Sequence, residues 1–228
     1  FGQRDARPLR RYSGLDAWLK ELSGRRSCPN NILKIEFYTM NPEVLLSRIR
    51  VVLCRPSHPG NIGAVARAMK TMGLSNLYLV SPKQFPDPEA DTRATGAVDL
   101  LQKAKITSSL AEALAGSSFA VALSARQRDL GPVIGQPRET VARLLAEAEQ
   151  GEVALVFGNE AVGLTNEEIL HCQAAVTIPT NPEFSSLNLG SAVQVLCHEC
   201  RMAAFSENPP AAEQGVTPFT SPAATADE

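Results

Sequence analysis

Three loops rich in glycine and asparagine, each placed after a short apolar run, limit what this chain can fold into. They read SHPGNIGAVARAMKTMGL (Ser57–Leu74), LVFGNEAVGLTNEE (Leu155–Glu168) and IPTNPEFSSLNLGSAVQVL (Ile178–Leu196). In each, turn residues follow the apolar run and precede residues at helical spacing. Strand, loop and helix repeated in this way predict an α/β fold, with a parallel sheet flanked by helices.

The same alternation continues along the rest of the chain. We expect strands at Ile49–Cys54, Leu77–Val80, Lys105–Thr107, Phe119–Leu123, Val153–Phe157 and Ala175–Ile178. We expect helices at Gly60–Met72, Glu139–Gln150, Thr165–Cys172 and Leu189–Phe205, with helical pieces within Ala90–Gly116. Gly73 is placed to end the first helix. Thr165, with Glu168 three residues on, matches a capping box.

The first loop places Gly60, Asn61 and Gly63 between a strand and a helix N-terminus. Such a loop can approach a ligand closely and offer N–H groups to an anion. Its spacing matches neither a GxGxxG fingerprint nor a phosphate-binding loop, so a simple tight turn is the stronger interpretation of this loop alone. Arg67 follows among small residues, where a snorkelling surface arginine is also common.

The second and third loops carry polar residues ahead of a helix. Gly158 and Gly163 would permit backbone contact with a flat ligand, with Glu160 anchoring the loop; an acidic turn before a helix is an equal alternative. Ser185 and Asn188 precede an apolar helix, and helix capping alone would explain them.

Taken together and in this order, the three loops resemble the three motifs of the SPOUT class of RNA methyltransferases. Within it, the TrmH/SpoU family of ribose 2'-O-methyltransferases matches best, from about Arg48 to Ala204. The resemblance implies a deep C-terminal trefoil knot, which is too rare to be proposed from the sequence alone. It also implies S-adenosylmethionine as the methyl donor, RNA as the substrate and a homodimer. The subfamily it resembles most methylates nucleotide 32 in the tRNA anticodon loop.

The resemblance assigns roles to individual residues. It implies a catalytic role for Arg67 and Asn61, with Ser186 near the reacting centre. Arg126 and Arg128 are candidate phosphate contacts that would bind RNA, although a solvated charged loop explains them too. The residues implied in cofactor binding are Leu123, Ser124, Ala125, Gly158, Asn159, Glu160, Gly163, Ile178, Ser185, Ser186, Leu187 and Asn188.

The chemistry limits what Arg67 can do. A ribose 2'-hydroxyl must lose its proton as it attacks a methyl group, and a guanidinium, which stays protonated to about pH 12, is a poor base. We therefore expect Arg67 to orient the hydroxyl and to neutralise the developing alkoxide and a nearby phosphate.

The charge distribution divides the chain into three parts. Residues 1–39 carry eight basic and four acidic side chains; we favour an expression artefact upstream of a native start at Met40 over a basic arm that contacts RNA. We expect residues 40–205 to form the methyltransferase domain that the resemblance implies. Residues 206–228 are rich in Pro, Ala and Thr, carry four acids and no base, and predict a tail or truncated linker. Because the net charge is −2, RNA must bind to a local patch.

Composition also restricts location and cofactors. Five scattered cysteines fit a reducing compartment, and in the absence of a signal-peptide pattern we expect a cytoplasmic protein. Cys197 and Cys200 lack a second ligand pair, and the three histidines lack carboxylate companions, so we expect no metal. No apolar run approaches the ~20 residues of a membrane span.

Three rival functions stay open at this point. One is 2'-O-methylation of ribosomal RNA or of another tRNA position. Another is a non-catalytic knotted protein that binds RNA, against which the intact polar residues of the three loops argue. A doubly wound nucleotide-binding enzyme is disfavoured because the phosphate-loop spacing is missing.

Overall fold

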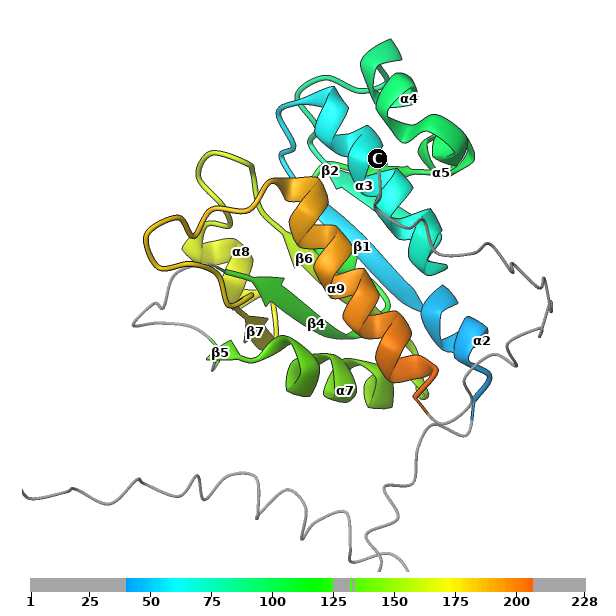
Figure 1. The fold of residues 1–228 in the computed structure, drawn as a ribbon, viewed down its shortest axis with the longest axis vertical. Coiled ribbons are helices and arrows are strands. Elements are labelled where there is room, and N and C mark those ends of the chain that lie inside the picture. Colours follow the sequence, from blue (N-terminus) through cyan, green and yellow to red (C-terminus); the bar gives the residue numbers. More distant parts are fainter. Residues whose placement is uncertain (1–39, 125–131, 133, 207–228) are drawn as a thin grey trace, which may run out of the picture. The chain divides into compact units, whose positions relative to one another are not determined.

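Seven parallel strands form one sheet in the part of the chain that the computed structural model describes, residues 40–124, 132 and 134–206 (Figure 1). The order across the sheet is β3-β2-β1-β6-β4-β7-β5. The strands are β1 (Ile49–Cys54), β2 (Asn76–Val80), β3 (Lys105–Thr107), β4 (Ser117–Leu123), β5 (Ile134–Gly135), β6 (Glu152–Phe157) and β7 (Ala174–Val176).

Helices separate most of these strands in the sequence. They are α2 (Pro42–Ser47), α3 (Pro59–Met72), α4 (Pro88–Ala94), α5 (Val98–Gln102), α6 (Leu110–Leu114), α7 (Pro137–Ala148), α8 (Asn166–Leu170) and α9 (Leu189–Ala204), with a 3-10 turn at Thr95–Ala97. None of these helices is long and apolar enough to cross a membrane.

The sheet is buried on both faces, as a parallel sheet with helical crossovers requires. In β1, Val51 and Leu53 belong to one hydrophobic cluster, and Val52 and Cys54 belong to another. The first cluster also contains residues of α2, α3, α4, α5, α7 and α9, and the second contains residues of α6 and α8. Figure 1 shows α9 lying between α3 and α7 over one face.

The predicted fold class is confirmed as a parallel sheet flanked by helices. Gly73 ends α3 in the left-handed conformation, with φ +84°, and Thr165 and Glu168 form the expected capping box of α8. The sequence interpretation missed α2 and the two-residue strand β5. The predicted strand Ala175–Ile178 is two residues too long at its C-terminal end, because β7 ends at Val176. The knot stays a prediction.

The strand order determines which loops meet. Strand β6 lies between β1 and β4, with Leu53 paired to Phe157 and Val121 paired to Leu155. Because all three strands are parallel, the loops after their carboxyl ends lie at the same edge of the sheet. In open α/β sheets ligands bind at this edge.

Candidate active site

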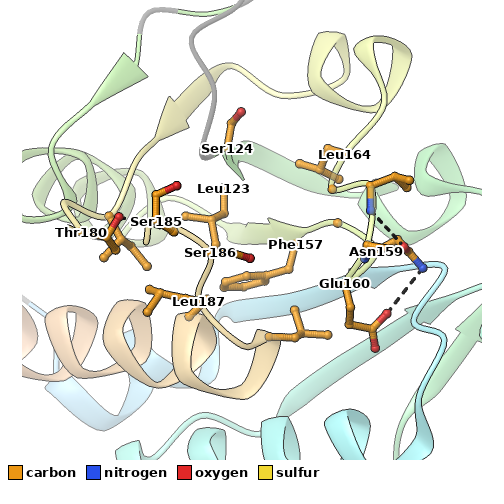
Figure 2. Close-up of a pocket in the computed structure, with 17 residues that line it drawn as sticks. Leu123, Ser124, Phe157, Asn159, Glu160, Leu164, Thr180, Ser185, Ser186 and Leu187 are labelled. Carbon is orange, nitrogen blue, oxygen red and sulfur yellow. Dashed lines mark hydrogen bonds between the residues drawn. The ribbon is translucent and has the colours of Figure 1, made fainter. Parts of the chain in front are cut away.

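A cavity of about 270 Å³ opens where β4 and β6 end and α9 begins (Figure 2). This is near the lower end of the roughly 300–1,000 Å³ typical of small-molecule sites. Its walls combine apolar side chains with the polar ends of two loops. The lining residues are Leu123, Ser124, Phe157–Leu164, Ile178, Thr180, Ser185–Leu187, Leu189 and Ala192.

The loop after β6 folds tightly back on itself. A Cβ added to Gly158 would lie 2.2 Å from the backbone nitrogen of Leu164, so only glycine fits there. Gly163 has φ +71°, a conformation that favours glycine. The side chain of Asn159 accepts hydrogen bonds from the N–H groups of Ala161 (2.9 Å) and Val162 (3.3 Å). The backbone of this loop is therefore held in one shape against the cavity.

Glu160 joins this loop to the start of α3. Its carboxylate accepts hydrogen bonds from the Ser57 N–H (2.9 Å), the Ser57 hydroxyl (2.7 Å), the His58 N–H (3.3 Å) and the Asn61 side chain (3.0 Å). Ser57 and His58 lie in the loop after β1 and Asn61 in the first turn of α3, and both segments reach Glu160 because β1 and β6 are neighbouring strands.

The hydrogen bonds keep Glu160 ionised. Burial by itself raises the pKa of this carboxyl group, but the hydrogen bonds from Asn61 and Ser57 outweigh burial and lower the pKa to about 2. A fixed negative charge therefore stands at the cavity wall at neutral pH.

Asn61 also reaches the third loop. Its side-chain oxygen accepts a hydrogen bond from the Asn188 side chain at 3.0 Å, while the Asn188 oxygen caps α9 by accepting from the Gly190 N–H at 2.9 Å. A chain of hydrogen bonds thus runs from Glu160 through Asn61 to Asn188. It connects one residue from each of the three loops.

Arg67 lies outside this cavity. It is exposed, and it lines a second groove together with Pro88, Glu89, Thr92, Arg93 and Thr95. Arg67 is six residues beyond Asn61 on α3, which corresponds to about 9 Å along a helix. The structure thus brings Asn61 into the network at the cavity and leaves Arg67 further along the same helix.

The glycines of the first loop lie in the first turns of α3, which begins at Pro59, one residue before the predicted start of this helix. Proline is well tolerated at the first helical position, since its missing N–H would have no partner there. The close approach predicted for Gly63 exists, but the neighbour is α4: an added Cβ would lie 2.1 Å from the Ala90 carbonyl oxygen.

The predicted cofactor residues largely come together. Those that line the cavity are Leu123, Ser124, Gly158, Asn159, Glu160, Gly163, Ile178, Ser185, Ser186 and Leu187. Asn188 lies beside the cavity and acts as a cap. Ala125, Arg126 and Arg128 lie outside the described residues.

Several lining residues were missed from the sequence: Phe157, Ala161, Val162, Leu164, Thr180, Leu189 and Ala192. Phe157 and Leu164 lie within the second loop, next to Gly158 and Gly163, and that adjacency was the available signal. Ala192 comes one turn into α9, and only the packing of that helix reveals its position.

The cysteines of the described residues do not form a reactive or metal-binding site. Cys197 and Cys200 are both buried in α9, and burial raises the pKa of each thiol, that of Cys197 to about 12. Thiols in such surroundings are unreactive. Among the described residues, no three His, Cys, Asp or Glu side chains gather as metal ligands.

Comparison with known proteins identifies the class. The SpoU rRNA Methylase family matches residues 48–198, which include all three loops up to the first turns of α9. The chain belongs to the SpoU rRNA Methylase family. This confirms the resemblance drawn from the three loops, and it makes the cavity a candidate active site of a methylase.

Individual relatives are more than half identical to this chain in sequence over the matched residues. A protein of Pseudomonas aeruginosa (strain UCBPP-PA14), named tRNA (cytidine/uridine/adenosine-2'-O-)-methyltransferase TrmJ, is 55% identical over 160 residues. That match covers 70% of this chain and 62% of the relative, so the chain spans less than two thirds of that protein. The tRNA (cytidine/uridine-2'-O-)-methyltransferase TrmJ of Salmonella typhimurium is 52% identical over 77% of this chain and 73% of its own length.

A solved structure supports the same fold. A probable methylase family protein from Haemophilus influenzae Rd KW20 superposes with a TM-score of 0.68 at 45% identity, covering 72% of this chain and 69% of that one. The fold described above is therefore similar to that of a methylase family protein whose structure is known.

Proposed function

We propose that this chain transfers a methyl group from S-adenosylmethionine to a ribose 2'-hydroxyl of RNA, with nucleotide 32 of the tRNA anticodon loop as the favoured target. The observation that carries the proposal is the hydrogen-bonded chain from Glu160 through Asn61 to Asn188 beside the cavity. The tRNA target is supported by the names of the TrmJ relatives. The scattered cysteines favour a cytoplasmic location.

The cavity suits the proposed cofactor chemically. Leu123, Phe157 and Leu187 offer apolar surface for an adenine ring, while the loop of Gly158 offers backbone polar groups. The ionised Glu160 favours a cationic ligand nearby. When bound, S-adenosylmethionine would supply the electrophilic methyl group, so no metal is needed for the transfer.

The chain's own residues would then position the substrate. Asn61 and Asn188 hold the start of α3 and the start of α9 together. Arg67 projects from α3 and carries a charge that can neutralise a developing alkoxide or a phosphate. Ser186 lies on the cavity wall, where a hydroxyl could orient the ribose.

A homodimer belongs to the same proposal. Three large apolar side chains are exposed around the cavity: Val162 (67%), Phe184 (80%) and Leu187 (40%). Exposed apolar surface beside a site is a common sign of an interface. Sedimentation equilibrium should give the mass of a dimer, and a Phe184→Ser variant should shift the equilibrium towards the monomer. A wild-type monomer at all concentrations would contradict this part.

Methyl transfer from labelled S-adenosylmethionine tests the function. Unmodified tRNA and ribosomal RNA are supplied separately to the wild type and to Arg67→Ala, Arg67→Lys and Arg138→Ala variants. Arg138 is 89% exposed on α7 and serves as a control for loss of a surface arginine. We expect label in tRNA, a loss of roughly 100-fold or more in kcat for Arg67→Ala, and no change for Arg138→Ala.

The other outcomes separate the rivals. Full activity of Arg67→Lys would contradict the need for a planar guanidinium at this position. Label in ribosomal RNA alone would show that ribosomal RNA, and not tRNA, is the substrate. Binding of both cofactor and RNA without any transfer would favour a non-catalytic RNA-binding protein.

A further inference from the structure

Helix α4 rests directly on the face of α3 that carries the glycines. Gly60, Gly63 and Arg67 are spaced three and four residues apart, so they share one face of the helix. A Cβ added to Gly63 would lie 2.1 Å from the Ala90 carbonyl oxygen, and one added to Gly60 would lie 2.6 Å from a Glu89 carboxylate oxygen. The backbone of α4 therefore approaches α3 as closely as glycine allows.

This packing places a second arginine beside Arg67. The added Cβ of Gly63 would lie 2.9 Å from the Cβ of Arg93, and that of Gly60 would lie 3.5 Å from its Cγ. The stem of Arg93 thus lies over the glycine face of α3. Arg93 and Arg67 line one open groove of about 590 Å³, on the surface where α3 meets α4.

Both arginines are available to a ligand. Arg67 and Arg93 are exposed, and within the described ranges neither guanidinium takes part in a hydrogen bond or an ion pair. The hydroxyl of Thr92 donates a hydrogen bond to the Pro88 carbonyl oxygen at 2.9 Å. Glu89 is the one carboxylate that lines the groove.

Helix α4 is fixed at both ends, so Arg93 sits on a rigid base. At its start, Asp87 caps the helix by accepting from the Glu89 N–H at 2.8 Å. Just beyond its end, Lys70 of α3 donates to the Gly96 carbonyl at 2.8 Å. Thr95 between them has φ +54°, which is strained for a β-branched residue. Strained backbone of this kind often marks a functional surface.

We propose that Arg93, set beside Arg67 by the α3–α4 packing, binds a phosphate of the RNA strand that enters the active site. The inference rests on the proposed function and adds a residue to it. Arginine binds phosphate through two parallel N–H groups, and phosphate contacts fix the register of a nucleic acid. Because the chain's net charge is −2, a local pair of arginines supplies attraction that the whole molecule lacks. Glu89 opposes that attraction.

The test compares charge-matched variants in the full chain. Arg93→Gln and the control Arg138→Gln each remove one exposed arginine. The probe is an unmodified, fluorescently labelled tRNA transcript, and its affinity is measured by anisotropy between 50 and 200 mM salt. For Arg93→Gln we expect about tenfold weaker binding and a salt slope smaller by about one, with unchanged affinity for S-adenosylmethionine. Arg138→Gln should match the wild type.

Kinetics and two further variants complete the test. In methyl transfer, Arg93→Gln should raise the KM for tRNA and leave kcat within about twofold, because the residue contacts RNA away from the reacting atoms. Glu89→Gln should strengthen tRNA binding severalfold, because it removes the carboxylate that lines the groove. Arg93→Lys should retain part of the affinity.

Two results would overturn the proposal. One is a tRNA affinity and salt slope for Arg93→Gln equal to those of Arg138→Gln. The other is a shift of Arg93→Gln to a smaller assembly in sedimentation, with RNA affinity restored at high protein concentration, which would make the groove a contact between copies. A wild type that binds tRNA tightly at this groove but transfers no methyl group would contradict the proposed function and leave this inference standing.

Discussion

At the scale of residues, Glu160 holds the site together. It accepts hydrogen bonds from Ser57, His58 and Asn61, and its neighbour Asn159 donates to the Arg55 carbonyl at 2.8 Å. Hydrogen-bond donors around a carboxylate favour its ionised form. The sequence interpretation correctly placed Glu160 as an anchor of its loop. The catalytic role that the resemblance implies for Asn61 stays a prediction; the structure shows its side chain bonded on both sides, to Glu160 and Asn188.

Stability should therefore depend on pH through Glu160. Its pKa is lowered from 4.5 to about 2 in the folded chain, so the unfolded chain binds this proton more readily. The stabilising contribution is present above about pH 4.5 and is lost as the pH falls towards 2. Urea unfolding of the wild type at pH 6, 4 and 3 should show this loss.

A matched pair of variants isolates the contribution. Glu160→Gln should be less stable than the wild type at pH 6 and should lose less stability on acidification. Glu139→Gln, at an exposed position of α7, should follow the wild type. If both variants showed the wild-type pH dependence, the hydrogen-bonded carboxylate would not be the cause.

At the scale of elements, α3 connects the parts of the site. Its first turn contacts Glu160, its glycine face contacts α4, and Ala64 contacts Gly190 of α9, where an added Cβ would lie 2.9 Å away. The sequence predicted this helix and its end at Gly73 correctly. It could not show that the glycines serve packing, because a glycine that approaches a ligand and one that approaches a helix look the same in a sequence.

Gly63→Ala tests that packing. The new methyl group would meet backbone atoms of α4, which have no flexible side chain to yield, so we expect a loss of about 1–3 kcal/mol in the free energy of unfolding. Gly96→Ala is the control, since an added Cβ there has nothing within 4 Å. Urea midpoints measure both. Equal midpoints would show that α4 moves away without cost.

At the scale of the whole molecule, the order of the strands creates the site. Short apolar runs, alternating with helical segments, predicted six of the seven strands and their common direction, because buried parallel strands are apolar throughout. They gave no reason to insert β6 between β1 and β4, an arrangement set by long-range packing. That insertion is what brings the loops of Asn61 and Glu160 together. The two-residue strand β5 was missed because so short a segment shows no hydrophobic pattern that could identify a strand.

The product of the reaction tests the central proposal most directly. Unmodified tRNA is methylated with labelled S-adenosylmethionine and then hydrolysed completely in alkali. Alkaline cleavage of RNA requires a free 2'-hydroxyl, so a ribose 2'-O-methyl group protects the adjoining phosphodiester. We predict that the label appears in an alkali-resistant dinucleotide that contains nucleotide 32. Label in mononucleotides would show methylation of a base and would contradict the proposal.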